Sequence, residues 1–81
     1  MQEKILQDLR NIGEAITLDL STISPDANLY EEGGLDSLDM LSLIQAAEDK
    51  FSVSKLDTQI ESILSLRDLA IRIEAKIGQR S

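Results

Sequence analysis

Apolar residues recur at intervals of three and four positions along three stretches of the chain, which is the spacing of a helix with one buried face. The first stretch starts at Gln2 and extends for about four turns, with apolar positions Ile5, Leu6, Leu9, Ile12 and Ile16. The second runs from Ser37 to Phe51, with an expected buried face of Met40, Leu43, Ile44, Ala47 and Phe51. The third carries Leu66, Leu69, Ala70, Ile73 and Ile77. The pattern predicts three helices.

Local signals set the ends of the last helix and indicate one short element before it. Ser65 stands three residues before Asp68, the arrangement of a capping serine, and Gly78 is expected to end the helix. About one or two turns of helix are expected over Asp57 to Ser62. The sequence has neither strand alternation nor an internal repeat. We therefore expect a single domain, residues 1–81, with an all-α bundle fold.

A long connection, TLDLSTISPDANLYEEGGLD, separates the first two predicted helices. Ser24-Pro25-Asp26 and Gly33-Gly34 within it are turn sequences. Its apolar residues are Leu18, Leu20, Ile23, Leu29 and Tyr30. Because a structureless loop of this length is unusual in a small domain, we expect these side chains to pin the loop to the core. Loops of this kind often carry function.

The charge of the chain narrows the classes of partner. The chain has 15 acidic and 8 basic residues, a net charge of −7, which argues against nucleic acid and anionic membranes because both are bound through Lys and Arg. Partners with basic surfaces are favoured, although acidity that serves only solubility is the simpler alternative. No run approaches the ~20 apolar residues of a membrane span, and the N-terminal MQEKILQDLR lacks the layout of a signal peptide, so a cytoplasmic protein is expected.

The segment GGLDSLDML, residues 33–41, places a serine at the start of the second predicted helix. Either Ser37 or Asp36 is expected to cap this helix by accepting a backbone hydrogen bond, and that role alone would explain the serine. The chain contains no His and no Cys. Because a serine nucleophile needs a positioned base, Ser37 is not interpreted as a hydrolase residue. Its hydroxyl is better interpreted as the acceptor of a chemical group than as a catalytic nucleophile.

Acidic residues surround this serine: Glu31, Glu32, Asp36 and Asp39. Leu41 follows one turn after Ser37 on the same helix face, so the combination indicates a contact surface for a partner. A catalytic pair of Asp36 and Asp39 is not favoured, because both are expected to lie in solvent without burial to separate their pKa values.

A calcium loop that begins at Asp26 is also not favoured, because Glu31 would stand where such a loop requires glycine. We therefore expect neither an enzyme active site nor a metal site.

These residues resemble the acyl carrier proteins and the related peptidyl carrier domains. The signature region corresponds to ISPDANLYEEGGLDSLDMLSLIQAAEDKF, and the resemblance runs without gaps from Ile23 to about Ile77. It implies a four-helix bundle of acyl carrier type, with three longer helices and a short third one. It also implies that Ser37, between Asp36 and Leu38, receives 4′-phosphopantetheine from coenzyme A as a phosphodiester. The terminal thiol of that arm would carry acyl or aminoacyl groups as thioesters.

The resemblance further implies which proteins this chain meets. They are a phosphopantetheinyl transferase and acyl- or aminoacyl-loading ligases, synthases or transferases with basic docking surfaces. The carrier itself is expected to be a monomer without nucleic acid or membrane insertion. The residues expected to dock its partners are Glu31, Glu32, Asp39, Leu41, Gln45, Glu48 and Asp49.

The chain departs from the family pattern at several positions. Gly33 replaces a frequent Leu, which predicts a looser loop before Ser37. Ser42 stands where an acid is common, Lys50 interrupts the acidic run, and SVSKLDTQIES lacks the usual glycine and proline. These departures predict dedicated partners in a specialised fatty acid, polyketide or nonribosomal peptide pathway. The alternative from another class is an unmodified acidic helical adaptor that binds a basic partner, with the serine as a simple cap.

Overall fold

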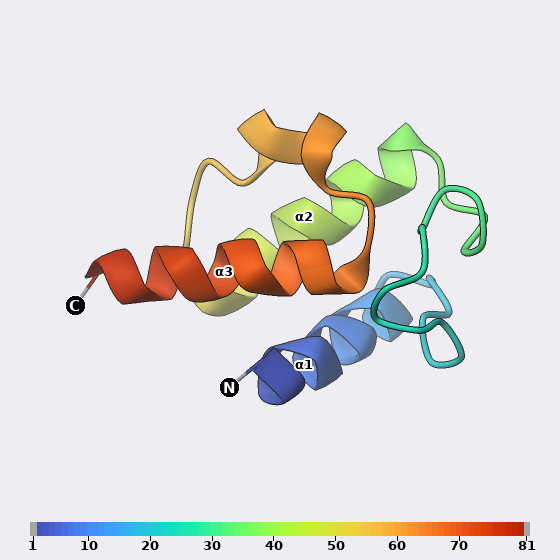
Figure 1. Ribbon diagram of the computed structural model, residues 1–81, viewed down its shortest axis with the longest axis horizontal. Coiled ribbons are helices and arrows are strands. Elements are labelled where there is room, and N and C mark those ends of the chain that lie inside the picture. Colours follow the sequence, from blue (N-terminus) through green and yellow to red (C-terminus); the bar gives the residue numbers. More distant parts are fainter. Residues whose placement is uncertain (1, 81) are drawn as a thin grey trace.

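The computed structural model describes residues 2–80, and for residues 57, 59 and 80 the backbone alone. Over these residues the chain forms three α-helices, one 3-10 helix and no strand (Figure 1). The elements are α1 (Gln2–Ala15), α2 (Ser37–Phe51), the 3-10 helix η1 (Asp57–Ser62) and α3 (Leu66–Arg80). The all-α class and the bounds of α2 are as predicted. The short helix is present as a 3-10 helix, so the described chain has three α-helices and not four.

The three α-helices enclose one core. Each packs against the other two, whereas η1 contacts α2 alone among the described helices and lies over it in Figure 1. The buried hydrophobic residues of the α-helices are Ile5, Leu6, Leu9, Met40, Leu43, Ile44, Ala47, Leu66, Leu69, Ala70 and Ile73. These belong to the predicted faces, and the remaining predicted residues, Ile12, Ile16, Phe51 and Ile77, are half-buried against the same core. None of the described helices is both long and apolar enough to cross a membrane.

The loop between α1 and α2 is pinned to this core, as expected. Leu20 and Leu29 are fully buried in it, and Leu18, Ile23 and Tyr30 are half-buried against it. The Leu29 backbone N–H also donates a hydrogen bond to the Leu64 carbonyl oxygen at 2.8 Å. The loop thus crosses the end of the bundle in contact with the start of α3 (Figure 1).

The expectation that Gly78 ends the last helix is wrong. α3 continues through Gly78 to Arg80, and Gly78 does not adopt the positive φ with which glycines commonly end helices. A glycine inside a helix costs only about 1 kcal/mol relative to alanine. That cost is too small to stop a helix whose preceding turns are packed in the core.

Candidate functional site

α2 begins at Ser37 because the preceding residue caps it. Asp36 has an extended backbone, and its Oδ1 accepts a hydrogen bond from the Asp39 backbone N–H at 2.9 Å. In return the Asp36 backbone N–H donates to Asp39 Oδ2 at 3.3 Å, which completes a capping box. The sequence left the cap open between Ser37 and Asp36, and the structure gives it to Asp36.

This cap leaves the Ser37 hydroxyl free. Ser37 is exposed, and its Oγ forms no hydrogen bond within the part of the chain that the structure describes. The residue lies in the first turn of α2, where unpaired backbone N–H groups and the positive end of the helix dipole favour negative charge. The geometry therefore presents an accessible hydroxyl at a position suited to an anionic substituent.

The loop segment that leads to Ser37 is a closely packed turn. The Asn28 side-chain Oδ1 accepts hydrogen bonds from the backbone N–H groups of Tyr30 and Glu31, at 2.9 and 3.0 Å. The Asn28 carbonyl oxygen accepts from Glu32 at 2.8 Å and from Gly33 at 3.3 Å. This turn of the chain fixes the two glutamates that precede the glycines.

Gly33 permits a close approach of two backbone segments. A Cβ atom at this position would lie 2.7 Å from the Leu29 carbonyl oxygen and 3.1 Å from Ile23 Cδ1. The looser loop expected from this glycine is therefore not found, because the absence of a side chain allows tighter packing. Gly34 has a φ of +70°, a conformation that glycine adopts without strain.

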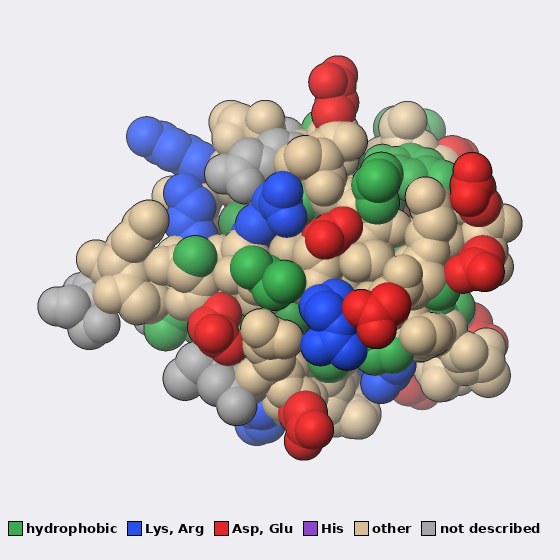
Figure 2. Space-filling model, viewed as in Figure 1, with side chains coloured by type: hydrophobic (Ala, Val, Ile, Leu, Met, Phe, Trp, Pro, Cys, Tyr) green, Lys and Arg blue, Asp and Glu red, His purple; other side chains and the backbone are tan. Residues whose placement is uncertain are grey.

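Acidic side chains gather at the end of the molecule where Ser37 lies. Glu31, Glu32 and Asp36 are exposed, and Asp39 is half-buried in the capping box. Figure 2 shows acidic side chains along the edge formed by the loop and the start of α2. The sequence has no Lys or Arg between Arg10 and Lys50. Within the described residues, no group of three acidic side chains is arranged to hold a metal ion.

The two leucines near Ser37, Leu38 and Leu41, differ in exposure. Leu38 is 73% exposed, whereas Leu41, the leucine expected at the contact surface, is half-buried. Gln45 and Asp49, further along α2, are exposed. The large exposed apolar side chain beside the serine is therefore Leu38.

Glu48 has a structural contact that sequence reasoning missed. Its Oε2 accepts a hydrogen bond from the backbone N–H of the buried Leu56 at 2.9 Å, and its carbonyl oxygen accepts from Ser52 and Val53. No local sequence signal indicates this bond, because its partner lies in the next connection. Asn28 was also missed, although an asparagine before a turn commonly bonds to backbone N–H groups two and three residues on.

Comparisons with known proteins find relatives that match most of the chain. A family model described as "Phosphopantetheine attachment site" matches residues 8–73, which include Ser37. A curated acyl carrier protein of Campylobacter curvus (strain 525.92) is 33% identical over 76 residues, covering 93% of this chain and 97% of that protein. One of Helicobacter pylori (strain G27) is 38% identical over 63 residues, covering 78% of this chain and 81% of that protein.

A solved structure has a similar fold. The crystal structure of an acyl carrier protein from Thermotoga maritima matches with a TM-score of 0.86 and 26% sequence identity. The match covers 99% of this chain and 94% of that one. The similarity therefore extends over the loop and all described helices.

Proposed function

Since the chain belongs to the acyl carrier protein family, we propose that Ser37 is the residue to which its 4′-phosphopantetheine group is attached. Proteins of this family are carriers and not enzymes, and they hold this group covalently. The observation that carries the assignment is the exposed Ser37 hydroxyl, which forms no hydrogen bond in the described part of the chain.

The residues around Ser37 fit a phosphodiester on its Oγ. The start of α2 favours negative charge at this position, as described above. The reciprocal hydrogen bonds of Asp36 and Asp39 hold the first turn without help from Ser37. Ser37 can therefore be modified without loss of the helix cap.

The bound arm supplies the thiol that the chain lacks, and acyl or aminoacyl groups are held on it as thioesters. The protein contributes a fixed attachment point and a surface for partner enzymes. Because the cargo is tethered, docking of the carrier gives that cargo a high effective concentration at the partner.

The docking surface in this proposal consists of the acids near Ser37 and of residues along α2, of which some are exposed and others half-buried. Its residues are Glu31, Glu32, Asp39, Leu41, Gln45, Glu48 and Asp49, with Asp36 and Leu38 beside the arm. Exposed carboxylates suit the basic docking surfaces of a phosphopantetheinyl transferase and of loading ligases, synthases or transferases. Leu38, 73% exposed, adds an apolar contact.

We also propose that the carrier is a cytoplasmic monomer with a four-helix carrier arrangement, in which η1 takes the place of the short third helix. Ser42 and Lys50 are exposed on α2, where family members commonly have acids. A surface altered at these positions favours dedicated partners in a specialised fatty acid, polyketide or nonribosomal peptide pathway.

The mass of the intact protein tests this function. After incubation with coenzyme A and a broad-range phosphopantetheinyl transferase, the wild-type chain should gain one phosphopantetheinyl group. Ser37→Ala should gain none, and Ser42→Ala, which removes another exposed hydroxyl of α2, should be modified like the wild type. No adduct on the wild type, under conditions that modify a control carrier, would favour the unmodified adaptor.

A further inference from the structure

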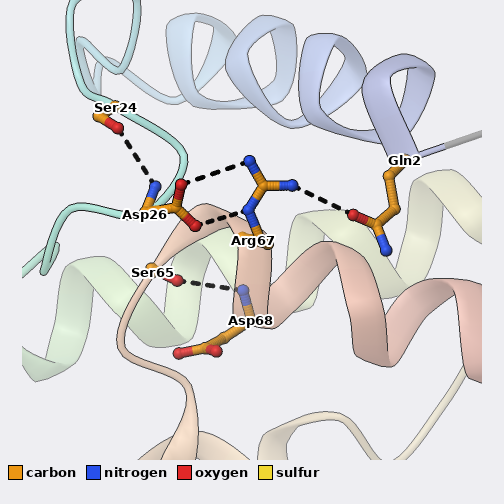
Figure 3. Close-up of polar contacts among 6 residues, drawn as sticks. All are labelled: Gln2, Ser24, Asp26, Ser65, Arg67 and Asp68. Carbon is orange, nitrogen blue, oxygen red and sulfur yellow. Dashed lines mark hydrogen bonds and ion pairs between the residues drawn. The ribbon is translucent and has the colours of Figure 1, made fainter.

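Arg67, at the start of α3, joins three segments that are distant in the sequence (Figure 3). Its Nε and Nη2 donate to the two carboxylate oxygens of Asp26 at 2.6 and 3.4 Å, and its Nη1 donates to Gln2 Oε1 at 3.3 Å. Its backbone N–H donates to the Pro25 carbonyl oxygen at 2.9 Å. One residue thus holds the loop between α1 and α2 through both its side chain and its backbone.

The helix start that carries Arg67 is itself fixed. Ser65 Oγ accepts a hydrogen bond from the Asp68 backbone N–H at 3.1 Å, which caps α3 (Figure 3). The Asp68 carboxylate accepts from the Leu64 backbone N–H, also at 3.1 Å. Arg67 therefore extends from a capped helix terminus, and the loop is bonded to a part of the helix that is itself fixed.

A chain of backbone hydrogen bonds links this anchor to Ser37. Three residues after Asp26, the Leu29 N–H donates to the Leu64 carbonyl oxygen at 2.8 Å, again at the start of α3. The Leu29 carbonyl oxygen then accepts from the Leu35 N–H at 3.1 Å. Leu35 directly precedes Asp36, the cap of α2. The loop residues 25–35, including both glutamates, are thus bonded to the start of α3 and end directly before the cap of α2, beside Ser37.

The Arg67–Asp26 pair is suited to fix geometry more than to stabilise the fold. The two side chains are 40% and 69% exposed, and exposed ion pairs contribute little to stability. The paired contacts to one carboxylate nevertheless define the orientation of both groups. The hydrogen bond and charge of the Asp26 carboxylate also raise the pKa of Arg67 above its ordinary value.

We propose that Arg67 is a positioning residue, which through Asp26 places the loop residues 25–35, and with them Glu31 and Glu32, in the arrangement that a phosphopantetheinyl transferase binds. This inference rests on the proposed modification of Ser37. It concerns the recognition of the carrier and not the chemistry at the hydroxyl, so loss of the pair should act on KM.

Steady-state kinetics of the transferase, with the apo-protein as the varied substrate, test this role. Arg67→Gln and Asp26→Asn should each raise KM by about threefold or more, with kcat changed by less than about twofold. Simple charge steering predicts opposite effects, since one variant makes the carrier more acidic and the other less. The double variant should resemble either single variant, because both remove the same interaction.

A matched control and a second measurement complete the test. Lys4→Gln also removes one positive charge and breaks a different ion pair, Lys4–Asp8 at 3.0 Å, and it should leave KM unchanged. Amide hydrogen exchange at Leu29 and Leu35 should be faster in Arg67→Gln, with circular dichroism like that of the wild type.

Three results would overturn the inference: an unchanged or lowered KM for Arg67→Gln, additive effects in the double variant, or unaltered exchange at both leucines. A wild-type chain that the transferase never modifies would instead refute the attachment at Ser37, and this role of Arg67 with it.

Discussion

Two adjacent residues at the start of α2 differ in what their side chains bond to. Asp36 caps the helix through its side chain, while the Ser37 hydroxyl forms no hydrogen bond within the described residues. Asp36→Ala should therefore lower the free energy of unfolding by about 1 kcal/mol, and Ser37→Ala should change it by less than ~0.5 kcal/mol. Urea unfolding of both variants measures this difference. Equal losses would mean that the serine is a structural cap.

What the sequence predicts at residue scale depends on how far apart the partners are. The Asp36 cap and the Ser65 cap each involve a residue three positions on, so a short motif encodes them. The Arg67–Asp26 pair spans 41 positions, and no local pattern specifies it. Gly33 was interpreted from its flexibility, whereas its value lies in a tertiary contact with Leu29.

At the scale of elements, the helices with strong apolar periodicity were predictable and their weak ends were not. α2 has a capping box at one end and a continuous apolar face, and its predicted bounds agree with the structure. α3 runs past the exposed Gly78 because one glycine costs too little to end a helix that is packed against the core as far as Ile77. The segment Asp57–Ser62 has no clear period, so a pattern alone could not distinguish a 3-10 helix from an α-helix.

The connection from α2 to η1 depends on Glu48. Its carboxylate accepts a hydrogen bond from the buried Leu56 N–H, so Glu48→Ala should cost about 1–3 kcal/mol of unfolding free energy by leaving that group without an acceptor. Glu48→Gln puts an amide oxygen, also an acceptor, in the place of the carboxylate oxygen. It should therefore lose less than about half as much unfolding free energy.

Thermal or urea unfolding distinguishes these Glu48 variants. Asp49→Ala is the matched control, since it removes an exposed carboxylate from the next position of α2 and should leave stability nearly unchanged. If the alanine and glutamine variants at Glu48 are equally stable, the hydrogen bond does not hold the connection. If Glu48→Gln also weakens partner binding at full stability, the residue contributes its charge to docking as well.

At the scale of the whole molecule, the charge distribution predicts the end of the carrier to which a basic partner is attracted. The net charge is −7, and the long stretch from Arg10 to Lys50 has no basic residue between its ends. Because that stretch includes the loop and all but the last two residues of α2, a partner with a basic surface should be attracted to the end that carries Ser37.

This attraction should be visible in the salt dependence of modification. Raising ionic strength from about 0.05 M to about 0.3 M shortens the screening length a little more than twofold, from roughly 14 Å to roughly 6 Å. The transferase KM for the carrier should therefore rise several-fold while kcat stays constant. The double variant Glu31→Gln, Glu32→Gln should have a higher KM at low salt and a flatter dependence of KM on salt, because two exposed charges near Ser37 are gone.

A wild-type KM that is insensitive to salt, or an equally steep dependence in the double variant, would mean that contacts other than these glutamates guide the partner. Leu38, exposed beside the serine, would then be the first residue to replace.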